Sequence, residues 1–361
     1  MAEYSPRIAT IGGIDIELHW TFIILLLISL AFSVYLFLVM VLLFMCVLVH
    51  ELFHSITSKI NGIKVKKIVL NFFGGGSVID FEHISPPMEF RISLVGPVAS
   101  LLLAALFGLL NIAFSFGIVG RTLQTLFVLN LFLGVFNLLP WLPLDGGRAL
   151  RSYLQRRMSF LDATRMAMRS SAIITILFVA GTVAYAALAH GYSLLYREFI
   201  VLLDIAIAVF IYGGAQAELQ AAFIKENSSD LKVRDAMTKD YTLIPGKATE
   251  DKLYGRILGG SSHIVLFRDK GKIMMFSGKP MQHPFRAPSS KAAALGRSIP
   301  SVDSNDGLYG ALYRMGSENA GAAAVLEKGR LCGILLASHA ESVIAIHISK
   351  KRKKSGTKPP S

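Results

Sequence analysis

The segment VLLFMCVLVHELFH, residues Val41 to His54, joins nine consecutive apolar residues to two histidines and a glutamate. A long uninterrupted apolar run is typical of a membrane-spanning helix, for which about 20 residues are needed. Ionisable side chains are costly inside a bilayer, and those found there mark functional positions. The segment therefore predicts a membrane helix with a polar site near one end.

The composition extends this prediction to much of the chain. Of the 361 residues, 53% are hydrophobic and 17% are charged, whereas a soluble protein has about a quarter of its residues charged. The mean hydropathy of +0.53 excludes a disordered chain. Cys46 and Cys332 are the only cysteines and lack a metal-binding spacing, so a disulfide framework is excluded as well.

The formal net charge of +13 raises nucleic acid as a partner. The basic residues, however, gather in the connections between apolar runs and at the end of the chain, where residues 349–361 predict a basic disordered tail. We assign this charge to loops and a tail beside the anionic lipid of the bilayer, and we expect no nucleic-acid partner.

The apolar runs are confined to about the first 223 residues. Six of them are expected to span a membrane: Trp20–Leu36, Phe37–Ile60, Phe90–Gly117, Arg121–Leu139, Ser171–Ala189 and Tyr196–Gly214. The sequence thus predicts a polytopic α-helical membrane domain over 1–223 and a smaller domain over 224–348, followed by the tail.

Lysines and arginines crowd the second and fourth connections between these spans, while the third holds only Arg121 and the fifth only Arg197. The excess of positive charge in cytoplasmic loops then places both termini in the cytoplasm of a multi-pass cell-membrane protein. We expect Ile11–Trp20 to form a turn and a short strand, not part of a cleavable signal peptide.

Two further regions predict β-structure. Between Ile63 and Ser85 an alternating apolar pattern predicts a β-hairpin, with the glycines 74–76 in its turn. After residue 228 the chain predicts an α/β domain with strands at Ser262–Phe267, Lys272–Phe276, Ala322–Leu326 and Cys332–Leu336. Its halves, Leu231–Lys279 and Gly296–Ala345, form a weak internal repeat.

The clearest chemical motif is His50-Glu51-Leu52-Phe53-His54. On a helix, residues four apart lie on one face, so both imidazoles can reach one Zn²⁺ ion, with Glu51 beside them as a proton acceptor. A catalytic zinc takes three protein ligands and leaves a place for water, whose pKa it lowers. Two alternatives, a chance match of the motif and buried histidines with ordinary hydrogen-bond partners, account poorly for three ionisable groups in an apolar span.

Asp145 is the expected third ligand, because the third and fourth apolar runs return the chain to the membrane face that holds the histidines. It follows two prolines and precedes Gly146 and Gly147, which allow close backbone approach. The alternative is an aspartate that caps the next helix. Two interpretations of Asn137 stay open: a hydrogen-bond donor to substrate or oxyanion, or an amide that satisfies carbonyls at its helix end.

The remaining polar candidates are expected to be structural. Asp204 lies within the last span and is expected to pair with a neighbouring helix. His19, His83 and His190 are unclustered, and His19 beside Trp20 fits an anchor at the membrane interface.

Taken together, these motifs resemble the site-2 protease family of intramembrane zinc metalloproteases. The resemblance rests on His50-Glu51-x-x-His54, on Phe136-Asn137-Leu-Leu-Pro140 and on Leu144-Asp145-Gly-Gly-Arg148. The glycine-rich hairpin at 73–76 and the segment Gly96-Pro97-Val98-Ala99-Ser100 fit the same pattern, which covers about 8–218.

The resemblance implies one Zn²⁺ per chain held by His50, His54 and Asp145, with Glu51 as general base and Asn137 as substrate or oxyanion contact. It implies cleavage of a transmembrane helix of another protein, unwound to reach the zinc. It also implies a gate between the first and last spans, and a hairpin near Phe72–Val78 that holds the substrate as an added strand.

The segment Val233-Arg-Asp-Ala-Met-Thr-Lys-Asp240 resembles the start of a cystathionine-β-synthase-type (CBS) domain pair. Such pairs often bind adenine nucleotides through an aspartate after a Ser or Thr. That aspartate is absent after Ser277, and Glu341 stands in the second repeat. The resemblance implies the fold, while a nucleotide ligand and a homodimer stay open.

An intramembrane zinc protease is therefore the leading hypothesis. The alternatives are a channel or transporter gated by the CBS pair, with a non-catalytic metal site, and an enclosed membrane protease acting on soluble or lipidated substrates. The first predicts internal repeats among the spans, which we do not find, and the second leaves the Leu144–Arg148 motif unexplained.

Overall fold

The computed structural model describes residues 6–63, 65–71, 74–79, 84–188, 193–245, 264–269, 272–276 and 296–355. The chain divides into two compact units, Met1–Phe223 and Ile224–Ser361.

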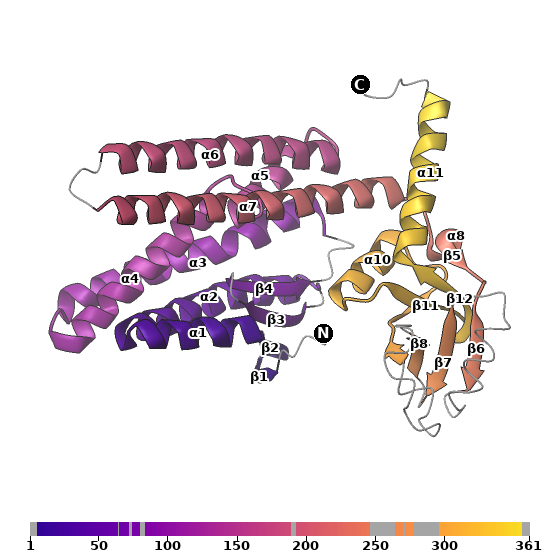
Figure 1. The fold of residues 1–361 in the computed structure, drawn as a ribbon, viewed down its shortest axis with the longest axis horizontal. Coiled ribbons are helices and arrows are strands. Elements are labelled where there is room, and N and C mark those ends of the chain that lie inside the picture. Colours follow the sequence, from indigo (N-terminus) through magenta and orange to yellow (C-terminus); the bar gives the residue numbers. More distant parts are fainter. Residues whose placement is uncertain are drawn as a thin grey trace. The chain divides into compact units, whose positions relative to one another are not determined.

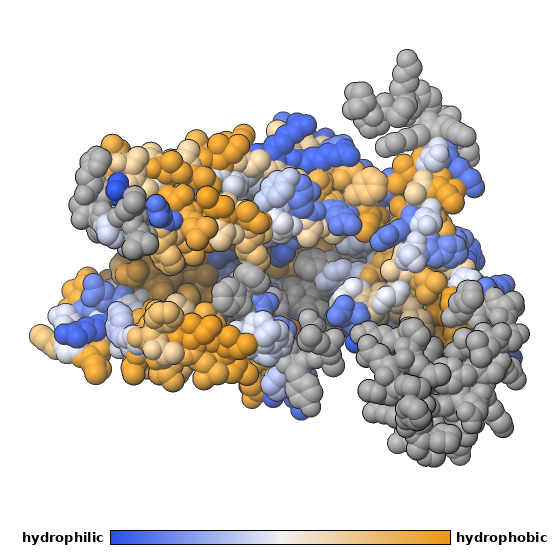
Figure 2. Space-filling view, viewed as in Figure 1, coloured by the Kyte–Doolittle hydropathy of each residue, from blue (hydrophilic) through white to orange (hydrophobic). Residues whose placement is uncertain are grey.

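Helices dominate the first unit (Figure 1). They are α1 (Trp20–Phe32), α2 (Val34–Ile60), α3 (Pro86–Ala113), α4 (Gly117–Leu138), α5 (Asp145–Leu154), α6 (Phe160–Leu188) and α7 (Leu194–Ser228). In the described part of the chain, five of these are long and apolar enough to cross a membrane: α2, α3, α4, α6 and α7. Their surface is largely apolar in Figure 2, as a lipid-facing surface requires.

The first of the six expected spans is shorter than predicted. The helix α1 has 13 residues, which at about 1.5 Å per residue gives roughly 20 Å, less than the hydrocarbon core of a bilayer. It ends because Ser33 adopts an extended conformation and caps α2, accepting a hydrogen bond from the Tyr35 amide. The apolar run therefore contains a helix break that hydropathy alone does not reveal.

A four-stranded sheet lies beside α2. Its order is β1 (Arg7–Ile11), β2 (Ile14–Leu18), β3 (Val65–Asn71) and β4 (Gly74–Ile79). The strands β1 and β2 form a hairpin around Gly12 and Gly13, both with positive φ, as the turn predicted near Ile11 requires. Buried side chains of β2 and β3 pack on Val47, Leu48 and Leu52 of α2.

The predicted hairpin at 63–85 is present, but its glycines lie elsewhere than expected. Gly74, Gly75 and Gly76 belong to β4 and pair with Asn71, Leu70 and Val69 of β3. Phe72 and Phe73 lie outside the described residues. Gly75 instead faces α2, where an added Cβ would stand 2.6 Å from Cγ of Glu51. The glycine is therefore needed for a close approach to α2 and not for a turn.

The helices of the first unit run back and forth, so their connections collect at two ends. The end of α3, the start of α4, the end of α6 and the start of α7 lie at one end, on the left of Figure 1, and the sheet and α5 lie towards the other. This arrangement brings the C-terminal part of α2, the first turns of α3 and the start of α5 to the same level. These are the segments that carry the candidate site.

The second unit contains two four-stranded sheets with matching topology. One has the order β10 (Ser301–Asp303), β11 (Ala322–Glu327), β12 (Arg330–Leu336) and β5 (Met237–Thr238). The other has the order β6 (Thr242–Pro245), β7 (Val265–Asp269), β8 (Lys272–Phe276) and β9 (Gly296–Ser298). Each begins with a parallel pair and continues with two antiparallel pairs.

Each sheet takes three strands from one half of the unit and its last strand from the other half. This exchange agrees with the internal repeat that the sequence indicates. A core that includes Leu266, Ile273 and Ile334 packs the sheets together, and α8 (Val233–Ala236), α10 (Leu308–Ser317) and α11 (Ala337–Ser355) cover the β10–β5 sheet.

The predicted disordered tail is partly wrong. Helix α11 continues through Ser355, so residues 349–355 are helical. Lysine and arginine are good helix formers, and a helix already nucleated by packed residues such as Ala340 and Ile344 extends into them at little cost. Residues 356–361 lie outside the described residues, as do His83, His190 and Ser277.

Candidate metal centre

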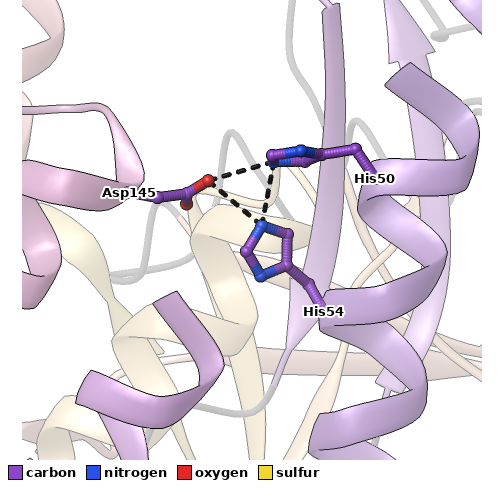
Figure 3. A group of neighbouring side chains, drawn as sticks. All are labelled: His50, His54 and Asp145. Atoms are coloured by element: carbon purple, nitrogen blue, oxygen red, sulfur yellow. Dashed lines mark hydrogen bonds and ion pairs between the residues drawn. The ribbon is translucent and has the colours of Figure 1, made fainter. Parts of the chain in front are cut away.

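Three side chains from two distant helices converge on one point (Figure 3). His50 and His54 lie on successive turns of α2, and Asp145 is the first residue of α5. The Asp145 Oδ2 atom lies 3.0 Å from Nε2 of His50 and 3.1 Å from Nε2 of His54. The two Nε2 atoms are 3.1 Å apart. The three atoms thus form a nearly equilateral triangle.

The far side of each imidazole ring is fixed by a hydrogen bond. Nδ1 of His54 lies 2.7 Å from the Ile92 carbonyl oxygen, which can only accept, so this nitrogen carries the proton and donates. In the neutral ring the Nε2 lone pair then faces Asp145. Nδ1 of His50 is 2.9 Å from the hydroxyl of Ser100. Both partners belong to α3, and second contacts of this kind orient metal-ligating histidines.

Gly96 of α3 leaves the space that this triangle needs. A Cβ at this position would clash with Nε2 of His54 and would lie 2.7 Å from Nε2 of His50. Residues 92, 96 and 100 follow one another at helical spacing of four, so one face of α3 supplies both ring contacts and the gap between them. Any larger residue would fill the position on which the three donor atoms converge.

The donor set fits Zn²⁺. Two imidazole nitrogens and one carboxylate oxygen are ordinary zinc ligands, and ligands about 2.0–2.1 Å from a tetrahedral ion stand roughly 3.3 Å apart. The observed separations of 3.0–3.1 Å are close to that value. Both histidines are buried, and Asp145 is mostly so. Without a bound cation, three polar groups whose acceptor atoms converge would be costly to bury in an apolar interior.

Asp145 is positioned by an unusually close approach of backbone segments. The alternative that it caps its helix is not what the structure shows, because Leu144 occupies the cap position and no side-chain cap bond forms. At Gly146 an added Cβ would collide with the carbonyls of Leu138 and Leu139, and at Gly147 with the backbone of Leu142. Both glycines therefore allow α5 to start directly against the segment that ends α4.

In the sequence Glu51 stands between the two histidines, and its side chain is half-buried. The Cγ atom of Glu51 lies next to Gly75, so the Glu51 side chain packs against strand β4. In the sheet order β4 is the last strand, and no described strand pairs with its outer side. The carboxylate is thus placed between the histidine pair and a free strand edge.

The other polar candidates lie outside the triangle. The Asn137 side chain donates to the Leu133 carbonyl one turn back in its own helix at 2.9 Å, a contact that leaves both of its interpretations open. His19 caps α1 by accepting from the Thr21 amide at 3.3 Å. Asp204 is buried on α7, but neither carboxylate oxygen has a hydrogen-bond partner among the described residues, so the helix–helix pairing expected for it is not seen.

Charged side chains surround the start of α5. Arg148 and Arg151 contact Glu218 of α7, and Arg151 also contacts Glu89 of α3. The Glu218 charge raises the pKa of Arg148. Burial lowers the pKa of Arg151, but the charges of Glu89 and Glu218 outweigh it and leave that pKa raised. Both arginines are therefore firmly protonated beside the aspartate.

Comparison with known proteins agrees with this geometry. The model of peptidase family M50 matches residues 38–117 and 111–178. The zinc metalloprotease MJ0392 of Methanocaldococcus jannaschii is 34% identical over 245 residues, which cover 65% of this chain and 67% of that protein. The chain belongs to peptidase family M50, the site-2 protease family. It is therefore a zinc metalloprotease with several membrane-spanning helices, and the channel or transporter alternative receives no support.

Two solved structures are also similar. The site-2 protease from Methanocaldococcus jannaschii is 33% identical, with a TM-score of 0.46, and covers 60% of this chain and 95% of that chain. The CBS domain of a bacterial CNNM/CorC-family Mg²⁺ transporter in complex with ATP is 16% identical, with a TM-score of 0.30, and covers 36% and 97%.

Sequence reasoning missed the groups that support the metal ligands. The sequence marks Gly96 and Ser100 only as part of a family motif, predicts Gly75 in a turn and gives Ile92 no role. The glycine spacing offered one signal, since Gly96 interrupts an apolar helix where a larger residue would be expected. The carbonyl of Ile92 offered none, because any residue supplies one.

Proposed function

We propose that His50, His54 and Asp145 hold one Zn²⁺ and that Glu51 is the general base of this protease. The convergence of three donor atoms around the gap left by Gly96 is the observation that carries the proposal. Zinc bound there would supply an activated water and polarise the peptide carbonyl.

The chain's own residues supply the remaining steps. The Glu51 carboxylate receives the proton released from the attacking water, and it then delivers this proton to the nitrogen of the departing amine. The α3 contacts of His50 and His54 keep both rings fixed while charge develops. The walls of apolar helices exclude bulk water, which strengthens these electrostatic contacts.

The substrate that fits this site is an unwound segment of a membrane-protein helix. Its peptide bond must leave helical geometry to approach three ligands that lie between α2, α3 and α5. The free edge of β4 passes Glu51 at Gly75, so a substrate strand added to this edge would run beside the general base. Pairing with β4 would also satisfy the backbone groups of the unwound segment.

Substituting Glu51 by Gln tests this assignment. Glu51→Gln keeps the size of the side chain and all three metal ligands, so the purified protein is expected to retain about one zinc per chain. Cleavage of a membrane-helix substrate should fall by roughly 10²- to 10⁴-fold, because the proton acceptor is lost. Both quantities are measured on one preparation, by metal analysis and by product formation in detergent or vesicles.

Asp145→Ala serves as the matched variant, and it should lose zinc and activity together. Wild-type cleavage by Glu51→Gln, or a full complement of zinc in Asp145→Ala, would contradict the proposed roles. Substrates are found by comparing membrane proteomes with wild-type and Glu51→Gln protein, where uncut helices should accumulate.

The proposal extends to orientation and to the second unit. The basic connections support a metal centre near the cytoplasmic face, with both termini in the cytoplasm. The exchange of strands between the two halves of the second unit supports a CBS-type regulatory module. An adenine nucleotide is the ligand to test for it, by direct binding to the full-length protein. Light scattering of that protein in detergent tests for a homodimer.

A further inference from the structure

Four charged side chains form a partly buried ionic cluster around α5, the helix that begins at Asp145. Nε and one terminal nitrogen of Arg148 donate to the same oxygen of Glu218, at 3.1 and 2.7 Å. Arg151 donates to the other Glu218 oxygen at 2.7 Å and, through its second terminal nitrogen, to Glu89. Two arginines and two glutamates balance in charge. We call this group the α5 clamp.

The α5 clamp connects three helices at one residue. Arg151 is only 4% exposed, and its planar guanidinium joins Glu89 in the first part of α3 to Glu218 of α7. Gln155 adds a hydrogen bond of 3.2 Å to Glu89, and the ring of Phe160 lies 4.9 Å from the Arg151 guanidinium carbon. Arginine suits this place because its fork can hold two carboxylates at fixed positions.

The clamp and the metal ligand share a short rigid element. Asp145, Arg148 and Arg151 follow one another at spacings of three on α5, so they lie on neighbouring faces of one helix. The close contacts of Gly146 and Gly147 hold the first turn of α5, and the clamp holds the helix through Arg148 and Arg151. A shift of α5 would move the Asp145 carboxylate away from the two imidazoles, which α3 holds separately.

We propose that Arg148, Arg151, Glu89 and Glu218 are positioning residues that set the place of Asp145 in the metal centre. A buried ionic cluster is poor evidence for added stability, since desolvation offsets much of the attraction. It does fix geometry, and a metal site needs ligands placed within a fraction of an ångström. The inference rests on the proposed role of Asp145.

The test compares zinc affinity with thermal stability in full-length variants. Arg151→Lys keeps the charge, but its single ammonium group cannot hold Glu89 and Glu218 in the same geometry. Zinc affinity, measured by chelator competition, should fall by about 10- to 100-fold, as for other residues that orient metal ligands. The visible spectrum of the Co²⁺-substituted protein should also change, because it reports the geometry of the ligands.

Glu218→Gln is the second variant, and its effect on zinc affinity should not add to that of Arg151→Lys, because both break one cluster. Arg165→Ala is the control: it removes an exposed ion pair with Asp162 on α6 and should leave zinc affinity and the Co²⁺ spectrum unchanged. A lower melting temperature with wild-type zinc affinity in both clamp variants would show a purely structural cluster and overturn the inference.

The role of Asp145 itself is tested separately. Loss of zinc in Asp145→Ala together with wild-type affinity in both clamp variants would reject the clamp alone. Retention of zinc in Asp145→Ala would reject the ligand assignment on which the clamp depends.

Discussion

Gly96 shows how one missing side chain makes a metal centre. The histidine pair and Asp145 supply donor atoms, but these can converge only because α3 presents hydrogen where every other residue has a Cβ. Four residues on either side, Ile92 and Ser100 hold the two rings. The chemistry of the site thus depends on a residue without functional groups.

Gly96→Ala is expected to abolish zinc binding while the helix still forms. The new methyl group would overlap the imidazole of His54, which must rotate out of the site, whereas alanine by itself favours a helix by roughly 0.5–1 kcal/mol. Metal content of the purified variant checks this outcome. Gly181→Ala on α6 is the matched control, since its Cβ would meet nothing within 4 Å, and it should bind zinc normally. Near-stoichiometric zinc in Gly96→Ala would contradict this account.

Among the elements, β4 and α2 form the contact that places Glu51, the proposed general base. A strand residue that faces a helix usually keeps a side chain between the two elements, but Gly75 has none and lets β4 approach α2 closely. Since successive residues of a strand face opposite ways, Gly75 faces Glu51 and Gly76 faces away. The two glycines are therefore not equivalent.

Gly75→Ala and Gly76→Ala make a matched pair that tests this contact. An added methyl at Gly75 would press on Glu51 and on Val47, so cleavage should fall at least about 10-fold while zinc content stays near one per chain. At Gly76 the methyl would meet nothing within 4 Å, and activity should remain close to wild type. Equal activity of the two variants would show that β4 does not position Glu51.

The ends of helices are the features that sequence patterns predict least well. The apolar run from Trp20 predicts one span through Leu36, yet Ser33 ends α1 after 13 residues. Conversely, α11 continues through a lysine-rich segment whose run of basic residues predicted a disordered tail. In both regions a local cap or an adjoining packed helix outweighs the average composition of the window.

At the scale of the whole molecule, the back-and-forth run of the helices brings residues that are far apart in the chain to the same end of the first unit. The run of α3 outward and α4 back places Asp145 beside histidines that precede it by more than 90 positions. Positive charge gathers at the same end, near α5 and the second connection. This end is therefore expected to face the cytoplasm.

The orientation can be measured by introducing one cysteine at a time into a Cys332→Ser variant, which keeps Cys46. Arg121 and Arg157 are both exposed and belong to opposite ends of the helices. A membrane-impermeant maleimide should label Arg121→Cys in intact cells and Arg157→Cys only after the membrane is opened, while the buried Cys46 stays unlabelled in both. Labelling in the reverse order would place the metal centre on the outer side.

The sequence by itself determined the class of the protein and three donor groups. Apolar runs fixed the membrane helices, because hydropathy is summed over local windows. The spacing of His50 and His54 predicted two imidazoles on one helix face, the proposed ligands, because helical periodicity is local as well. Asp145 followed from counting spans, and the close backbone approaches at Gly146 and Gly147 followed from the two glycines next to it.

Only the tertiary structure decided what holds these groups in place. The gap at Gly96, the ring contacts of Ser100 and Ile92, the strand edge beside Glu51 and the α5 clamp all join residues far apart in the chain. No periodicity links Glu218 to Arg151 or Gly75 to Glu51, since their contact depends on how helices and strands pack. The sequence therefore specifies the reactive groups, and the packing of α2, α3, α5 and β4 specifies their geometry.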